Sequence, residues 1–92
     1  MDSQKVRIAR GMELLDRENP SWCDKIELKS LDVGNVGHCV LGQVYGEYID
    51  GVGALGIAFH TERHGFMWLN SDSVMGLTRS WKKAIKERCD EA

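Results

Sequence analysis

The stretch that decides the fold is residues 39–56, which read CVLGQVYGEYIDGVGALG. The large apolar residues in its first part are Val40, Leu41, Val44, Tyr45 and Tyr48. At the helical period these positions cover more than half of the circumference, which is typical of a helix buried on several sides. The sequence therefore predicts a central helix over residues 39–49.

The glycines of this stretch predict close packing. Gly42 and Gly46 lie four residues apart and so one above the other on a helix, where they leave a shallow groove for a neighbouring backbone. We expect packing within the chain there, with a homodimer through the same face as the alternative. Residues 51–56 are expected to form a loop or a looser helical turn. Neither Lys nor Ser/Thr follows these glycines in the phosphate-loop arrangement, which argues against nucleotide binding.

The segment before this stretch predicts a first helix over residues 4–17. Its apolar side would carry Val6, Ile8, Met12 and Leu15, and its solvent side Arg7, Arg10, Glu13 and Arg17. Asn19-Pro20 should end the helix, because the residue before a proline is pushed out of the helical region. The same pair can start a short helical turn with Trp22 facing inward.

The carboxy-terminal segment predicts the clearest helix, which begins near residues 71–73 and runs to about Cys89. Its apolar stripe steps by three or four residues through Val74, Leu77, Trp81, Ile85 and Cys89. Residues 25–33 and 65–69 are the only candidates for strands. The expected fold is a single domain over residues 1–92, mainly α with three to four helices, or α+β with a minimal two-stranded pairing.

Composition bounds the functional class. The chain has 92 residues, a net charge of −2 and 28% charged residues, so it offers no general attraction to nucleic acid or to an anionic membrane. Every apolar run is interrupted by charges before it could span a bilayer, and no secretion signal is recognisable at the amino terminus. Cys23, Cys39 and Cys89 are odd in number and lack a framework spacing. They predict reduced thiols in a cytoplasmic protein.

Candidate catalytic and metal-binding groups are few. His60 and His64 at i and i+4 could share a helix face, with His38 or a cysteine completing a metal site. The adjacent Gly65 and the absence of a Cys-x-x-Cys pair argue against one. Cys39 follows His38 directly, and adjacent side chains point apart, so we expect a packed core thiol. We predict no catalytic residue, cofactor or metal, and no enzyme, with a small metal protein or enzyme as a minor alternative.

Binding is the function that remains. The candidate interface residues are Tyr45, Tyr48, Phe59, Phe66 and Trp68. Most of these aromatic side chains are expected in the core, and the one or two that are exposed would anchor a protein–protein interface. The alternative is a nucleic-acid-binding regulator that uses the basic face of the last helix, formed by Arg79, Lys82, Lys83 and Lys86. Gln43, a polar residue within the apolar run, is expected to hydrogen-bond a nearby loop, with a ligand contact as the alternative.

Motifs along nearly the whole chain carry a resemblance. They are Leu14-Leu15-Asp16, Pro20-x-Trp22, Ile26-x-Leu28-x-x-Leu31-x-Val33, Cys39-Val40-Leu41-Gly42-Gln43-Val44-Tyr45-Gly46, His64-Gly65-Phe66 and Leu77-x-x-x-Trp81. With these motifs the chain resembles small uncharacterised proteins of actinobacteriophages and of actinobacterial prophages. The resemblance implies a bacterial host cytoplasm and a role in modifying the host through a host protein. It brings no catalytic or ligand-binding residue.

Overall fold

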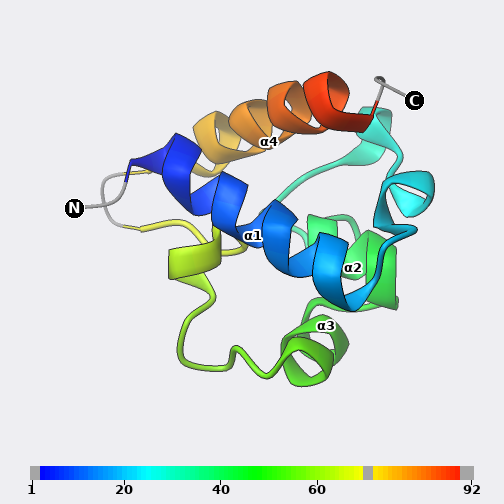
Figure 1. The fold of residues 1–92 in the computed structure, drawn as a ribbon. Coiled ribbons are helices and arrows are strands. Elements are labelled where there is room, and N and C mark those ends of the chain that lie inside the picture. The colour runs from blue at the N-terminus through cyan, green and yellow to red at the C-terminus, as the bar shows by residue number, and fades with distance from the viewer. Residues whose placement is uncertain (1–2, 70–71, 90–92) are drawn as a thin grey trace.

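The computed structural model describes residues 3–69 and 72–89 (Figure 1). Its four α-helices are α1 (Gln4–Glu18), α2 (Val40–Tyr45), α3 (Tyr48–Leu55) and α4 (Val74–Cys89). Three short 3₁₀ turns join them, η1 (Trp22–Lys25), η2 (Leu28–Ser30) and η3 (Glu62–His64). The predicted mainly α class is confirmed.

The alternative with a two-stranded pairing is wrong, because the described residues contain no strand. Residues 28–30 coil into η2, where the Leu31 amide donates to the Leu28 carbonyl oxygen. The side chains of Leu31 and Val33, which follow η2, are both buried in the core. The other expected strand begins at Gly65, whose φ of 74° ends η3 in the left-handed region. Apolar side chains pin both segments to the core without a ladder of backbone hydrogen bonds.

Helices α1 and α4 lie side by side above α2 and α3 (Figure 1). The least exposed side chains form one cluster, to which α1, η1, α2 and α4 contribute Leu15, Trp22, Leu41, Leu77 and Trp81. Trp22 faces inward at the start of η1, and α4 buries the predicted stripe at Leu77, Trp81 and Ile85, so both expectations are confirmed.

The first helix is placed correctly, but two of its side chains were assigned to the wrong side. Val6 is 46% exposed, whereas Arg7 is only 4% exposed. Arg7 is buried because its guanidinium donates two hydrogen bonds to Asp72, at 3.0 and 2.8 Å, just before α4 begins. This ion pair compensates for the loss of water around the charges and ties α1 to α4.

The predicted central helix over residues 39–49 is divided into α2 and α3. Gly46 ends α2 with a φ of 99°, a conformation that side chains rarely adopt, so the helix cannot continue through it. Gly42 packs against the backbone of the preceding loop, and a Cβ there would collide with the Val36 carbonyl oxygen. Close packing within the chain at Gly42 is therefore confirmed, but Gly46 takes no part in a groove. In α3, Gly51 packs against Leu41.

The cysteines correct a further expectation. Cys23 and Cys89 form a disulfide with a Cα–Cα distance of 5.8 Å, and Cys39 alone is free. Their side chains meet because η1 returns from the end of α1 to the end of α4, a proximity that sequence spacing does not reveal. The disulfide removes the argument by which three reduced thiols indicated a cytoplasmic protein. None of the described helices is long and apolar enough to cross a membrane.

Candidate binding surfaces

The free thiol of Cys39 lies at the amino-terminal cap of α2 and is 2% exposed. Burial raises the pKa of this thiol above its usual value, and this effect outweighs the Gly42 amide, which donates to Sγ at 3.2 Å. A raised pKa keeps the group protonated at neutral pH and makes it a poor nucleophile. Cys39 is therefore a capping side chain of the core, as its residue type predicts.

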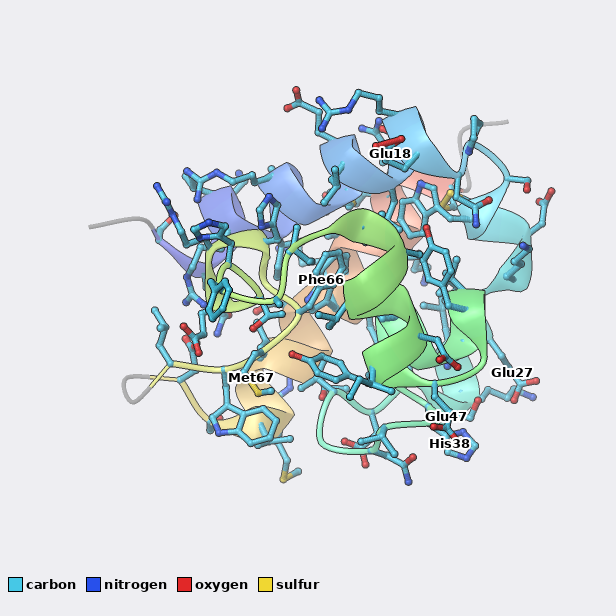
Figure 2. The ribbon with its side chains drawn as sticks, turned by 90° about the horizontal axis from the view of Figure 1, so that it is seen from below. Glu18, Glu27, His38, Glu47, Phe66 and Met67 are labelled. Carbon is cyan, nitrogen blue, oxygen red and sulfur yellow. A yellow bond between two sulfur atoms is a disulfide. The ribbon has the colours of Figure 1, made fainter. Side chains whose placement is uncertain are left out.

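The three histidines do not converge. The Nδ1 atom of His64 lies 2.8 Å from the carbonyl oxygen of His60, and its ring stacks on Phe66. His38 lies near Glu47 at the edge of the molecule, away from Phe66 at its centre (Figure 2). Within residues 3–69 and 72–89, no group of three His, Cys, Asp or Glu side chains is arranged to hold a metal ion.

Gln43 fastens α2 to the segment between η1 and η2. Its side-chain oxygen accepts a hydrogen bond from the Glu27 amide, and its Nε2 lies 3.1 Å from both the Glu27 and the His38 carbonyl oxygens. The side-chain amide of Gln43 thus pairs with backbone groups of this segment as another backbone amide would. The predicted hydrogen bond to a nearby loop is confirmed.

Of the candidate interface aromatics, Phe66 is a core residue. It is 2% exposed and stacks on Trp81 with ring centroids 5.5 Å apart. The Trp81 Nε1 donates to the Gly65 carbonyl oxygen at 2.5 Å and fixes both rings. Phe66 is therefore unavailable to a partner, in agreement with the expectation that most of these aromatic side chains lie in the core. Tyr45 and Tyr48 are half-buried.

The pKa of Tyr48 is raised, chiefly by burial, which the hydrogen bond to the Thr61 side chain partly offsets. Trp68 is 38% exposed. Tyr45, Tyr48 and Trp68 therefore offer only part of their surface to a partner.

Phe59 is the predicted interface residue that the structure exposes most, with 92% of its surface accessible. It lies in a turn that follows α3, where Gly56 caps the helix in the left-handed conformation and the His60 amide donates to the Ile57 carbonyl oxygen. Ile57 and Thr61 are buried on either side of the turn. The fold thus holds an aromatic ring in solvent between two anchored ends.

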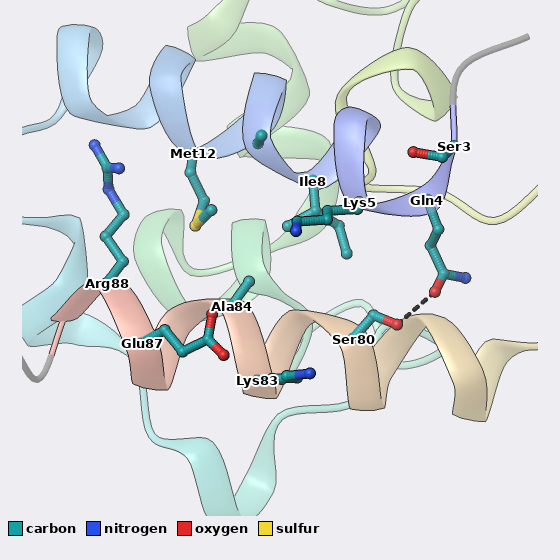
Figure 3. A pocket seen from close by; sticks show the side chains of 11 residues that line it. Ser3, Gln4, Lys5, Ile8, Met12, Ser80, Lys83, Ala84, Glu87 and Arg88 are labelled. Carbon is teal, nitrogen blue, oxygen red and sulfur yellow. Dashed lines mark hydrogen bonds between the residues drawn. The ribbon is translucent and has the colours of Figure 1, made fainter.

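A groove of about 660 Å³ lies between α1 and α4 (Figure 3). The residues that α1 contributes are Gln4, Lys5, Ile8, Ala9 and Met12, and those of α4 are Ser80, Lys83, Ala84, Glu87 and Arg88. Both sets follow the helical spacing of one face. Sequence analysis missed this groove because it depends on which helices lie side by side, although the small residues Ala9 and Ala84 permit it.

The basic face of α4 is exposed to solvent. Arg79, Lys83 and Lys86 are exposed and Lys82 is half-buried, and none of them forms an ion pair with a described residue. Arg79 and Lys82 also border a smaller hollow of about 460 Å³ beside η2, together with Lys29. The face carries a positive potential on a chain whose net charge is −2.

Comparison with known proteins finds no match: no family model, no curated protein and no solved structure resembles the chain significantly. The function therefore has to be argued from the surfaces themselves. Of these, the Phe59 turn and the α1–α4 groove combine apolar area with a fixed geometry.

Proposed function

We propose that this chain is a small non-catalytic binding protein that docks on a partner protein through the turn carrying Phe59. The observation that supports the proposal is the 92% exposure of a phenylalanine whose neighbours Ile57 and Thr61 are buried. Because both ends of the turn are anchored, its backbone loses little conformational freedom on binding. Such a side chain fits the role of an anchor that enters a pocket of the partner.

The contribution of Phe59 to affinity follows from the apolar area of its side chain. Full burial of a phenylalanine side chain contributes about 2 to 3 kcal/mol. Transfer of the Phe59 ring into a partner's pocket would therefore change the dissociation constant by about 30- to 150-fold. Ile49, which is 72% exposed on α3, adds further apolar surface to the protein.

The resemblance to actinobacteriophage and prophage proteins supports a bacterial host protein as the partner. On this proposal the protein modulates the host by occupying a surface of that protein, as in host takeover or exclusion. Binding alone suffices for such an effect, and no catalytic group is required.

The proposal is tested by affinity capture from actinobacterial lysate with the wild type, Phe59→Ala and Met75→Ala. Met75 is the matched control, because it is 74% exposed but lies on α4. A partner captured in near-stoichiometric amount should be retained by Met75→Ala and reduced at least tenfold by Phe59→Ala. The two variants should unfold at the same temperature as the wild type. Equal capture by Phe59→Ala, or no stoichiometric partner, would contradict the proposal.

A further inference from the structure

The α1–α4 groove carries two cations that face it from opposite helices (Figure 3). Lys5 comes from α1 and Lys83 from α4, and neither forms an ion pair with a described residue. The third cation, Arg88, is paired with Asp16, and Glu87 is the one carboxylate among the described residues that line the groove. A ligand in the groove would therefore meet two ammonium groups without an ion pair among the described residues and one carboxylate, a balance that is positive.

Apolar side chains line the groove between these cations. Ile8 is 2% exposed and belongs to the core, and Met12 and Ala84 are partly buried against it. The lining positions are 4, 5, 8, 9 and 12 on α1 and 80, 83, 84, 87 and 88 on α4, so each set occupies one face of its helix. Two such ridges form the kind of channel into which a third helix packs.

Polar contacts hold the groove in shape at both ends. At one end the Ser80 hydroxyl donates to the Gln4 side-chain oxygen (Figure 3). At the other end Arg88 pairs with Asp16. Arg88 directly precedes Cys89, which forms the disulfide. A groove that is formed before binding spares the ligand the cost of ordering it.

We propose that the α1–α4 groove binds an amphipathic, acidic helical segment of a partner protein. Apolar side chains of the segment contact Met12 and Ala84, and its carboxylates pair with Lys5 and Lys83. The other cations of α4, such as Lys86, extend the positive field and speed association with an acidic segment. A nucleic acid is less suited, since phosphates would reach the ammonium groups but would leave the apolar floor uncovered.

This surface is separate from the one proposed above. In Figure 1 α4 lies at the top of the molecule, and the chain that follows α3 runs along the bottom, while Figure 2, seen from below, has α3 in front. The two surfaces would allow the protein to contact two partners, or two regions of one. Failure at the groove therefore leaves the Phe59 proposal intact, and the reverse also holds.

The test uses a fluorescent synthetic peptide about 18 residues long, sufficient for several helical turns, with leucines on one helical face and glutamates elsewhere. Fluorescence anisotropy measures its dissociation constant with the full-length protein. The peptide should bind at least tenfold more tightly than a scrambled peptide of the same composition, in which the leucines are spread around the helix. Amide chemical-shift changes should concentrate on α1 and α4.

The decisive variant is Lys5→Glu/Lys83→Glu, and its matched control is Lys29→Glu/Arg63→Glu. Both pairs are exposed and produce the same net charge, but the control pair lies outside the groove. The groove variant should bind the facial peptide at least tenfold more weakly than the control variant does. Equal losses in the two variants, equal binding of the scrambled peptide, or tighter binding of a short DNA duplex would each overturn the proposal.

Discussion

Reduction of the Cys23–Cys89 disulfide should lower the stability of this protein by about 4 kcal/mol. The two cysteines are 66 residues apart in sequence, so the bond closes a loop that includes most of the chain. Loop-closure entropy for that length corresponds to about 4 kcal/mol of lost stability on reduction. A protein of this size is typically stable by about 5 to 14 kcal/mol, so reduction removes between about a third and four fifths of that stability.

Urea denaturation with and without a phosphine reductant measures the effect. Trp22 and Trp81 are fully buried, so the change in tryptophan emission reports loss of the core. With a denaturant slope of about 1 to 2 kcal/mol per molar urea, the loss of about 4 kcal/mol lowers the midpoint by about 2 to 4 M. The Cys23→Ser/Cys89→Ser variant should unfold like the reduced wild type and should not respond to the reductant. An unchanged midpoint in reductant, or a double variant as stable as the oxidised wild type, would refute the reasoning.

Three further predictions test the interior. Asp72→Asn leaves the Arg7 guanidinium buried without its counter-charge and should lower the free energy of unfolding by about 3 kcal/mol, measured by urea denaturation. The pKa of the Asp72 carboxyl is lowered, chiefly by its hydrogen bonds with Arg7. Its contribution to the free energy of unfolding is therefore present above about pH 4 and is lost as the pH falls further. The Asp72→Asn variant should lack this part of the acid sensitivity of the wild type. Gly42→Ala should destabilise by about 3 kcal/mol because its Cβ meets a backbone carbonyl, whereas Gly53→Ala, with open space around it in α3, should stabilise by about 0.5 to 1 kcal/mol in thermal melts. Cys39 should react with iodoacetamide only after denaturant is added, as mass spectrometry can show; rapid alkylation of the native protein would contradict its burial.

The helices were predictable where periodic apolar positions and local end signals agree. The α4 stripe over Leu77, Trp81 and Ile85 is one such pattern, and Asn19-Pro20 ended α1 within one residue of the expected position. The break at Gly46 was not predictable in the same way, because a glycine is compatible with the apolar pattern on both sides of it. Only its φ of 99° shows that the chain changes direction there.

The long-range contacts explain the remaining errors. Arg7 was placed in solvent because charged side chains usually lie there, and only the arrival of Asp72 beside it makes its burial tolerable. Cys23 and Cys89 were judged by spacing, which carries no information on their distance in the fold. Of the surfaces, the basic face of α4 follows from local sequence. The sequence named Phe59 as a candidate but did not show which of the aromatic side chains is exposed, and the α1–α4 groove requires knowledge of which helices pair.

The contacts that fix α4 also account for the shape of the groove. The Arg7–Asp72 pair ties the chain just before α4 to α1, and the disulfide at Cys89 holds the other end. Between these two ties Ala9 and Ala84 line the groove, and their small side chains leave space that larger ones would fill. A core this small could have been closed more completely by larger residues at these positions, with a gain in buried apolar area. On the proposal made above, Ala9 and Ala84 leave this space for the apolar side chains of the bound helical segment.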